Sequence, residues 1–324
     1  MAEYGDFKPT DAVRDLVPKV DYHSNSIVDL PLLMVQLTRF SCGGLCVGVA
    51  ISHSLADGLA AVQFINSWAK LAREDRLEEK DLPFLDRTVL KSSEPPMAPR
   101  FEHTELKDIR SLNGPHTMSE RMKETSVTLL RLTKEQVEKL KKKANEDGLS
   151  SSQSRPYSRF EVIAGHIWRL NRPLPANYFG NAVLRTRTSP RIIGDIVSNP
   201  LSYSAQSIRE GIEMLTQENL RSQLDFIAGQ EDVSWLRGSF HTLGCMEAPF
   251  TGNPDMLIGV WTNIPMYEAD FGWGGPLYIG PALLNADGKS FIMSCPSEDG
   301  ALTIALRFQT IHMESFKKFF YDDI

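Results

Sequence analysis

Two apolar runs followed at once by a helical pattern constrain how the first quarter of the chain can fold. Residues Leu32 to Phe40 and Leu45 to Ile51 are rich in apolar side chains and flank a Ser-Cys-Gly-Gly turn. Two such runs around a glycine-bearing turn predict a β-hairpin. Beyond Asp57-Gly58, apolar residues recur at helical spacing through residues 59–73 and cover a wide face. Such a face indicates a helix pressed against a sheet.

The pattern changes along the chain and divides it into three parts. Residues 1–80 hold the hairpin and the helix. Residues 81–124 carry clustered prolines and scattered charges without a sustained period, which indicates a crossover segment. Residues 125–324 contain both strand-type apolar runs and helical periodicity, so the sequence predicts an α/β fold. In this last part we expect strands at 125–132, 256–261, 276–279, 290–294 and 302–308, and helices at 157–170, 208–228 and 313–321.

One further helix has a clear start signal. Thr133 is a good N-cap, and Gln136 stands three residues later, as in a capping box. Val137, Leu140 and Ala144 would form its buried stripe, and Gly148 would end it.

Charge, apolar run length and cysteine spacing exclude several classes of protein. A formal charge of −6 gives no basic stripe to neutralise phosphates, which argues against a nucleic-acid binder. No stretch approaches the roughly 18 apolar residues of a membrane span, and the first residues lack the apolar region of a secretory signal. The four cysteines show no zinc-ligand spacing and indicate reduced thiols. We expect a cytoplasmic monomer that binds neither nucleic acid nor membrane.

His53 is the first candidate catalytic residue. It stands at the end of the second apolar run, in His53-Ser54-Leu55-Ala56-Asp57-Gly58, beside small residues that leave it open to a cleft. An ordinary histidine pKa of about 6.5 suits proton removal near neutral pH. The alternative is a core or turn histidine, with Asp57 serving only as the N-cap of the following helix. This segment alone does not separate the two.

The second candidate segment is Asp270-Phe271-Gly272-Trp273-Gly274. Its two glycines let the backbone turn sharply around the tryptophan. The indole N–H can only donate, so it could bind negative charge that develops on an acyl oxygen. A packed tryptophan in a tight turn is the alternative.

Together the two segments resemble the BAHD acyltransferase family, whose signatures are H-x-x-x-D-G and D-F-G-W-G. Both are intact here, at 53–58 and 270–274, and residues 164–169 and 177–181 (Asn-Tyr-Phe-Gly-Asn) are also similar to these enzymes. The resemblance runs over nearly the whole chain. It implies two chloramphenicol-acetyltransferase-like domains with mixed sheets and helices, and a channel at their interface.

The resemblance also implies a role for each motif residue. His53 would take a proton from the acceptor, which then attacks the thioester of an acyl-CoA co-substrate. Trp273 would hydrogen-bond the resulting oxyanion. Asp57 would face an arginine pair, and Asp270 would be an anchor remote from the channel. Gly58, Phe271, Gly272 and Gly274 would complete the structural motifs. No metal or permanently bound cofactor is needed, because a thioester is already activated.

The acceptor is suggested by the residues before the second motif. Relatives that act on shikimate or quinate carry an arginine where Asn263 stands, and an amide holds a carboxylate less strongly. Residues 248–254 resemble the spermidine hydroxycinnamoyl transferase branch, which implies a hydroxycinnamoyl-CoA donor and a polyamine acceptor. Glu268 and Asp255 are candidates to bind its ammonium groups, although surface or turn carboxylates fit equally well. O-acylation of a neutral or shikimate-type alcohol is the alternative.

The chain departs from the family at two places. Family members carry an N-terminal block before the segment that resembles Gly5-Asp6-Phe7. They also insert a loop and a strand with arginines where Trp168-Arg169-Leu170 runs almost directly into Pro173. A lost central strand leaves unpaired backbone groups that cost on the order of 1–3 kcal/mol each. A truncated, catalytically inactive acyltransferase-like protein is therefore a hypothesis from a different class.

Overall fold

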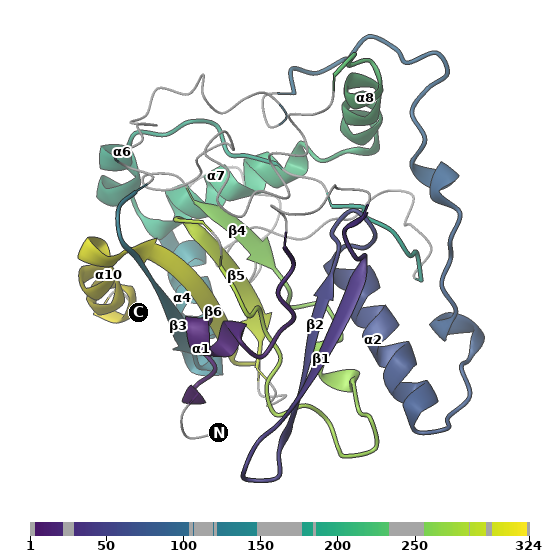
Figure 1. The fold of residues 1–324 in the computed structure, drawn as a ribbon. Helices are drawn as coiled ribbons and strands as arrows, with labels where there is room; N and C mark the ends of the chain where they lie inside the picture. The colour runs from purple at the N-terminus through teal and green to yellow at the C-terminus, as the bar shows by residue number, and fades with distance from the viewer. Residues whose placement is uncertain are drawn as a thin grey trace.

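The computed structural model shows two sheets with helices around them (Figure 1). It describes residues 4–21, 29–103, 106, 119, 122–147, 177–183, 186–232, 256–284, 286–295 and 300–322. The helix predicted at 157–170, Gly148 and Asp255 lie outside the described residues.

The predicted hairpin is present at the start of the chain. Strands β1 (Leu33–Arg39) and β2 (Leu45–Ile51) pair antiparallel, with Leu33 opposite Ile51. Helix α1 (Asp11–Arg14) precedes them, and the backbone after it crosses the inner face of the hairpin so closely that a Cβ on Gly48 would lie 2.0 Å from Leu16 O. In the described part of the chain these strands pair with no third strand, and three apolar side chains on the outer face of β1 are exposed: Leu33, Val35 and Leu37.

The predicted helix follows as α2 (Gly58–Ala72), which lies beside the hairpin (Figure 1). Its first turns bury Ala60 and Ala61 together with Ala56, against Ile51, Leu55 and Phe179. In the described part of the segment that follows, η3 (Glu79–Asp81) leads into the crossover and η4 (Arg87–Leu90) lies within it; both are short 3-10 helices.

The larger sheet has the strand order β3-β6-β5-β4. Strands β3 (Thr125–Leu132), β6 (Leu302–Gln309) and β5 (Lys289–Ser294) pair antiparallel, whereas β4 (Leu257–Val260) pairs parallel with β5. The sheet is therefore mixed, as expected. Its core buries Met266, Leu284, Met293 and Ala305.

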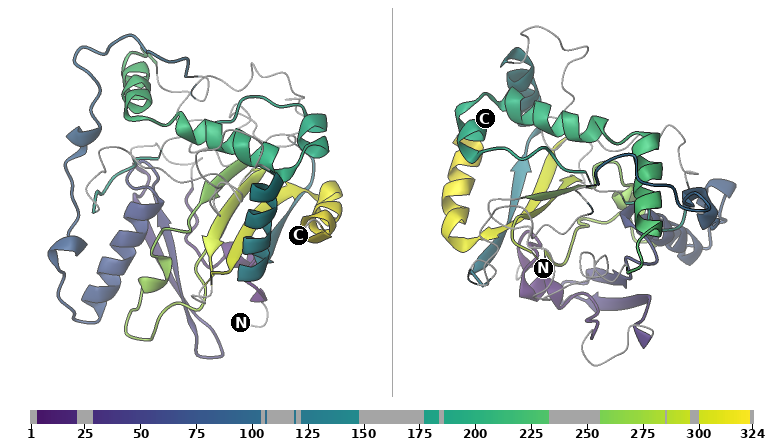
Figure 2. Two further views of the ribbon diagram at one scale, coloured as in Figure 1. Left: turned by 180° about the vertical axis from the view of Figure 1, so that it is seen from behind. Right: turned by 90° about the horizontal axis from the view of Figure 1, so that it is seen from above.

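Helices pack around this sheet. Helix α4 (Lys134–Asp147) contacts β3 and α7 (Leu201–Glu213), and α10 (Thr310–Asp322) runs beside β3 and β6 (Figure 2). The predicted capping box is present: Thr133 N donates to Gln136 Oε1 at 2.9 Å, and Gln136 N donates to Thr133 Oγ1 at 3.2 Å. Helix α6 (Ile193–Ser198) precedes α7 in the chain, and α8 (Gln217–Ala228) follows it and lies apart from the sheet (Figure 1).

Two predicted elements differ from the structure. The single helix expected at 208–228 is two helices, α7 and α8. The reason is that the Thr216 hydroxyl accepts a hydrogen bond from Asn219 N at 3.1 Å and so starts a new helix. The strand expected at 276–279 is absent, and these residues follow an irregular path on which Leu277 is 78% exposed. A short apolar run after a proline was an insufficient signal for a strand.

The crossover is tied to α8 by side chains of that helix. Ser222 Oγ accepts from Arg100 N at 2.9 Å, and Asp225 Oδ1 accepts from Ser93 N at 2.8 Å. None of the helices in the described ranges combines the length and apolar content that crossing a bilayer requires.

We expect Gly48→Ala to lower the free energy of unfolding by about 1–3 kcal/mol, because the new methyl group would overlap the Leu16 carbonyl. Urea unfolding followed by circular dichroism would measure the change. Gly194→Ala is the matched control, because a Cβ there meets nothing within 4 Å. Equal stability of the two variants would contradict the close approach at Gly48.

Candidate active site

His53 lies in the short turn between β2 and α2, and its side chain is exposed. Leu55 N donates to Ser52 O at 2.9 Å, and Ala56 N donates to the same oxygen at 3.3 Å. These bonds fold residues 52–56 into a tight turn at the end of the strand. The histidine is therefore exposed at the surface, which excludes a core histidine, while its opening to a cleft stays a prediction. We call residues 53–58 the motif loop.

The Asp57 carboxylate holds two parts of the chain together. Its Oδ1 accepts from Ala60 N at 3.0 Å, which is the N-cap bond of α2, and its Oδ2 accepts from Ala182 N at 3.0 Å. Asp57 N in turn donates to Gly180 O at 3.0 Å. Within the described ranges, the hydrogen bonds to this carboxylate come from backbone amides, and Arg169 lies outside those ranges, so the arginine pair stays a prediction.

Residues 177–183 lie against the motif loop. Asn181 Nδ2 donates to His53 O at 2.8 Å, and the Phe179 ring packs on the alanines at the start of α2. Gly180 has no Cβ, and one added there would lie 2.5 Å from the Tyr178 hydroxyl. Burial around Tyr178 raises the pKa of its phenol. The sequence analysis singled out this stretch only as a family resemblance; its contact with His53 comes from the structure.

Arg87 is a second residue at the motif loop that the sequence analysis did not single out. Its Nη2 donates to Leu55 O at 3.2 Å. The side chain comes from the first residue of η4, whose N-cap Asp86 accepts from Thr88 N at 2.9 Å. The residues Asp86-Arg87-Thr88 could have indicated the start of a short helix that places Arg87, but the sequence analysis interpreted this segment as a crossover.

The second motif forms a turn around the Asp270 carboxylate. Oδ1 accepts from Gly272 N at 2.8 Å and from Gly274 N at 2.9 Å, and these amides hold the pKa of Asp270 below its usual range. Both glycines have φ above 90°, a conformation that side-chain-bearing residues rarely adopt. The Arg73 guanidinium donates to Asp270 O and lies 3.8 Å from its carboxylate. Asp270 is a structural anchor in this geometry.

Trp273 lies at the opposite end of α2 from His53. Phe271 packs edge-on against Trp68 with ring centroids 4.9 Å apart, and Trp273 stacks on Phe271 at 6.0 Å. Trp68 belongs to the last turns of α2, whereas His53 precedes its first turn. A helix of 15 residues is about 22 Å long. The structure therefore does not bring the indole, which is 70% exposed, beside His53.

The two acceptor-binding candidates separate along the same helix. A Cβ added to Gly58 would lie 3.3 Å from the Ile264 side chain and 3.9 Å from the indole nitrogen of Trp261. Asn263 stands between these two residues in the sequence and is exposed. We infer that it lies near the motif loop. Asn66 Nδ2 donates to Pro265 O at 3.0 Å, about two turns farther along α2. Glu268 follows, exposed, closer to the second motif than to His53.

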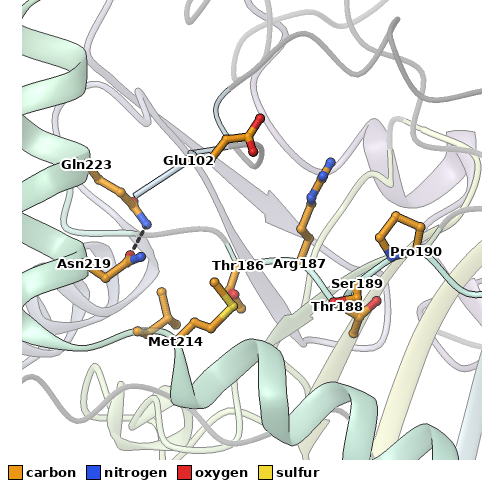
Figure 3. Close-up of a pocket in the computed structure, with 10 residues that line it drawn as sticks. Glu102, Thr186, Arg187, Thr188, Ser189, Pro190, Met214, Asn219 and Gln223 are labelled. Atoms are coloured by element: carbon orange, nitrogen blue, oxygen red, sulfur yellow. Dashed lines mark hydrogen bonds between the residues drawn. The ribbon is translucent and has the colours of Figure 1, made fainter. Parts of the chain in front are cut away.

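A polar pocket lies apart from both motifs, between the end of the crossover, residues 186–190 and the turn from α7 to α8 (Figure 3). Its buried wall is Asn219 and Gln223, joined by a hydrogen bond of 2.8 Å, and Gln223 Oε1 has no hydrogen-bond partner among the residues that the structure describes. Arg187 and Glu102 supply opposite charges. No residue of 53–58 or 270–274 lines this pocket. In the described part of the chain, no group of three or more His, Cys, Asp or Glu is placed to hold a metal ion.

Comparisons with known proteins identify relatives along the full length of the chain. The model of the Transferase family matches residues 1–173 and 169–323. The hydroxycinnamoyl-CoA:piscidic acid hydroxycinnamoyltransferase of Actaea racemosa is 39% identical, over 100% of this chain and 78% of its own length. The shikimate O-hydroxycinnamoyltransferase of Nicotiana tabacum is 37% identical, over 99% of this chain and 76% of its own length.

Solved structures share the fold. Vinorine synthase superposes with a TM-score of 0.61 over 94% of this chain and 69% of its own, at 18% identity. F. sporotrichioides TRI101, crystallised with coenzyme A and T-2, superposes with a TM-score of 0.65, also at 18% sequence identity. This superposition covers 94% of this chain and 72% of TRI101. These likenesses support the two-domain chloramphenicol-acetyltransferase-like architecture. The division at 80 and 124 and the channel between the domains stay predictions.

The comparisons also bear on the internal departure from the family. The Actaea alignment spans 354 positions, although the chain has 324 residues, all of them covered, so the relative carries internal residues that this chain lacks. The two stretches matched by the family model meet at residues 169–173. This is the junction at which the sequence analysis expects a loop and a strand to be missing.

We expect Trp273→Phe to leave the rate of acyl transfer within about threefold of the wild type. Loss of an oxyanion-hole donor costs on the order of 10²–10³ in kcat, and the position of Trp273 beyond the far end of α2 removes it from that role. Steady-state turnover with a hydroxycinnamoyl-CoA measures the effect. A drop of a hundredfold with unchanged thermal stability would contradict this geometry.

Proposed function

The chain belongs to the Transferase family, the BAHD acyl-CoA-dependent acyltransferases, and we propose that it moves a hydroxycinnamoyl group from coenzyme A to a polyamine, such as spermidine, with His53 as general base. The observation that carries the proposal is the exposed His53 on a turn whose backbone is held from outside by Asn181, Gly180 and Arg87. A general base must be both accessible and fixed, and this arrangement supplies both properties.

The proposed reaction needs only a base and an activated ester. His53 removes a proton from the acceptor amine as the nitrogen attacks the thioester carbonyl carbon. The carbonyl oxygen becomes an oxyanion in the tetrahedral intermediate. The intermediate then collapses, the carbon–sulfur bond breaks, and the coenzyme A sulfur leaves with the proton that the imidazolium returns. The products are an amide and free coenzyme A, and acyl-CoA is a co-substrate instead of a resident cofactor.

Asn263 supports the amine acceptor. It stands where shikimate- and quinate-type relatives are expected to carry an arginine, and it lies near the motif loop beside Ile264. A neutral amide does not repel an ammonium group, whereas a guanidinium would. Glu268 contributes less to this argument, because it lies farther along α2, toward the second motif.

A second candidate acceptor is a hydroxy acid, acylated on oxygen. Relatives that are 39% and 37% identical carry piscidic acid and shikimate in their names, and both compounds are carboxylic acids. Arg87 favours this candidate within the site, because its guanidinium is bound to the Leu55 carbonyl and presents a cation at the motif loop. The same base chemistry at His53 would then act on a hydroxyl group.

We expect His53→Ala to lower kcat with p-coumaroyl-CoA by about 10²–10⁴, because the base that accepts the acceptor proton is lost. His312→Ala is the matched control, since His312 is exposed on α10, a helix that packs against β3 and β6 of the larger sheet, whereas His53 follows β2 of the hairpin. The assay follows release of free thiol from coenzyme A, with spermidine and shikimate as competing acceptors.

Each outcome of that assay decides between the hypotheses. An amide product with spermidine supports the polyamine acceptor, and an ester product with shikimate supports the second candidate. A folded wild-type protein that is inactive with every acceptor would support the truncated, inactive acyltransferase-like protein. Equal turnover of wild type and His53→Ala would remove His53 as the base.

We expect Asn263→Arg to lower KM for shikimate at least tenfold, which corresponds to about 1.4 kcal/mol, because a guanidinium holds a carboxylate with charge-assisted hydrogen bonds. KM for spermidine should rise, since the new cation repels ammonium groups. Asn263→Gln is the control that keeps the amide. If both variants leave the two KM values unchanged, Asn263 does not face the acceptor.

A further inference from the structure

We propose that Asn181 is a positioning residue that fixes the imidazole of His53 through the backbone of the motif loop. The inference rests on the proposed role of His53 as general base. It concerns the short segment Gly180-Asn181-Ala182, which we call the clamp.

The clamp contacts the motif loop at both of its ends. Asn181 Nδ2 donates to the carbonyl oxygen of His53 itself at 2.8 Å. On the other side, Asp57 N donates to Gly180 O, and Ala182 N donates to Asp57 Oδ2, both at 3.0 Å. Gly180 accepts a hydrogen bond, whereas Asn181 and Ala182 each donate one, so a shift of one residue along the clamp would break these bonds together. The loop is therefore held in one register between its first and fifth residues.

The clamp is itself held by elements outside the motif loop. Phe84 N donates to Asn177 O at 2.8 Å, and Phe179 N donates to Phe84 O at 2.9 Å, as in a short parallel bridge. The Phe179 ring is packed on Ala56, Ala60 and Ala61. The segment leading into Asn181 is thus fixed to the crossover and to the helix that follows His53.

The side chain of Asn181 is the part of the clamp that reaches the histidine. Its Nδ2 donates to His53 O, and its Oδ1 accepts a weaker bond from Val183 N at 3.4 Å. An aspartate has the same shape and keeps the second contact, but it has no proton to donate to a carbonyl. Asn181→Asp therefore removes one interaction and leaves the volume unchanged. A general base displaced by about 1 Å costs on the order of 10²-fold in rate.

A carboxylate at position 181 would also act on the charge of His53. A nearby negative charge favours the imidazolium, so the pKa of His53 rises and the free base is lost at a higher pH. Among the described residues, the charged groups hydrogen-bonded to the motif loop or part of it are Arg87, bound to Leu55 O, and Asp57, bound to backbone amides, and Asp86 stands next to Arg87 at the start of η4. These groups remain in place in the variant, so the change in pH dependence is attributable to position 181.

The test compares kcat, KM and the pH–rate profile of the wild type, Asn181→Ala, Asn181→Asp and a control. Asn199→Asp is the matched control, because Asn199 is also an exposed amide that donates to a backbone carbonyl at 2.8 Å, at the end of α6. We expect Asn181→Ala to lower kcat about 10–100-fold with KM for acyl-CoA within threefold. Asn181→Asp should lower kcat similarly and move the acid limb of the profile to higher pH.

A spectroscopic readout separates this inference from the proposed function. The His53 imidazole resonance, assigned by its loss in His53→Ala, is titrated by NMR in each variant. The expected results are a raised pKa in Asn181→Asp, a shifted resonance in Asn181→Ala and no change in Asn199→Asp. A wild type without turnover would refute the proposed function while leaving these differences intact. Asn181 variants that match Asn199→Asp in both turnover and titration would overturn the positioning role.

Discussion

The Asp57 carboxylate is the interaction on which the candidate site depends. One oxygen begins α2 through Ala60 N, and the other binds Ala182 N, more than a hundred residues later in the chain. Hydrogen bonds to a charged acceptor contribute about 1.5–3 kcal/mol each. Removal of this carboxylate would therefore free both the helix start and the neighbouring segment. The aspartate thus acts on the turn that carries His53 through hydrogen bonds to backbone amides.

Helix α2 then determines which of the two sequence motifs can share chemistry. Gly58 at its first turn lies against Ile264, Asn66 in its middle binds Pro265 O, and Arg73 at its end holds Asp270. The segment from 261 to 272 therefore runs along the helix in the same direction. His53 and the D-F-G-W-G turn therefore lie at opposite ends of α2, and the turn is joined to the helix through Arg73 and Trp68.

The same packing bears on the missing internal segment. The family resemblance implies that the arginines beside Asp57 would come from that part of the chain; among the described residues, the carboxylate accepts hydrogen bonds from the amides of Ala60 and Ala182. The β1–β2 hairpin keeps its register and its inner contact with Leu16, while Leu33, Val35 and Leu37 stay exposed on its outer face within the described ranges. Among the described residues, the turn keeps its backbone hydrogen bonds to Ser52 O while the sheet that carries it has two strands.

The sequence by itself determined the hairpin, the helix after Gly58, the Thr133 capping box and the family, because these follow from local spacing and from motifs a few residues long. It could not show that α7 and α8 are separate, since a side-chain cap at Thr216 overrides a continuous helical pattern. Nor could it show that Asn181 and Arg87 meet the motif loop, or that Trp273 lies beyond the far end of α2. Only the tertiary structure decided these points, because contacts between residues tens to hundreds of positions apart depend on how the segments pack.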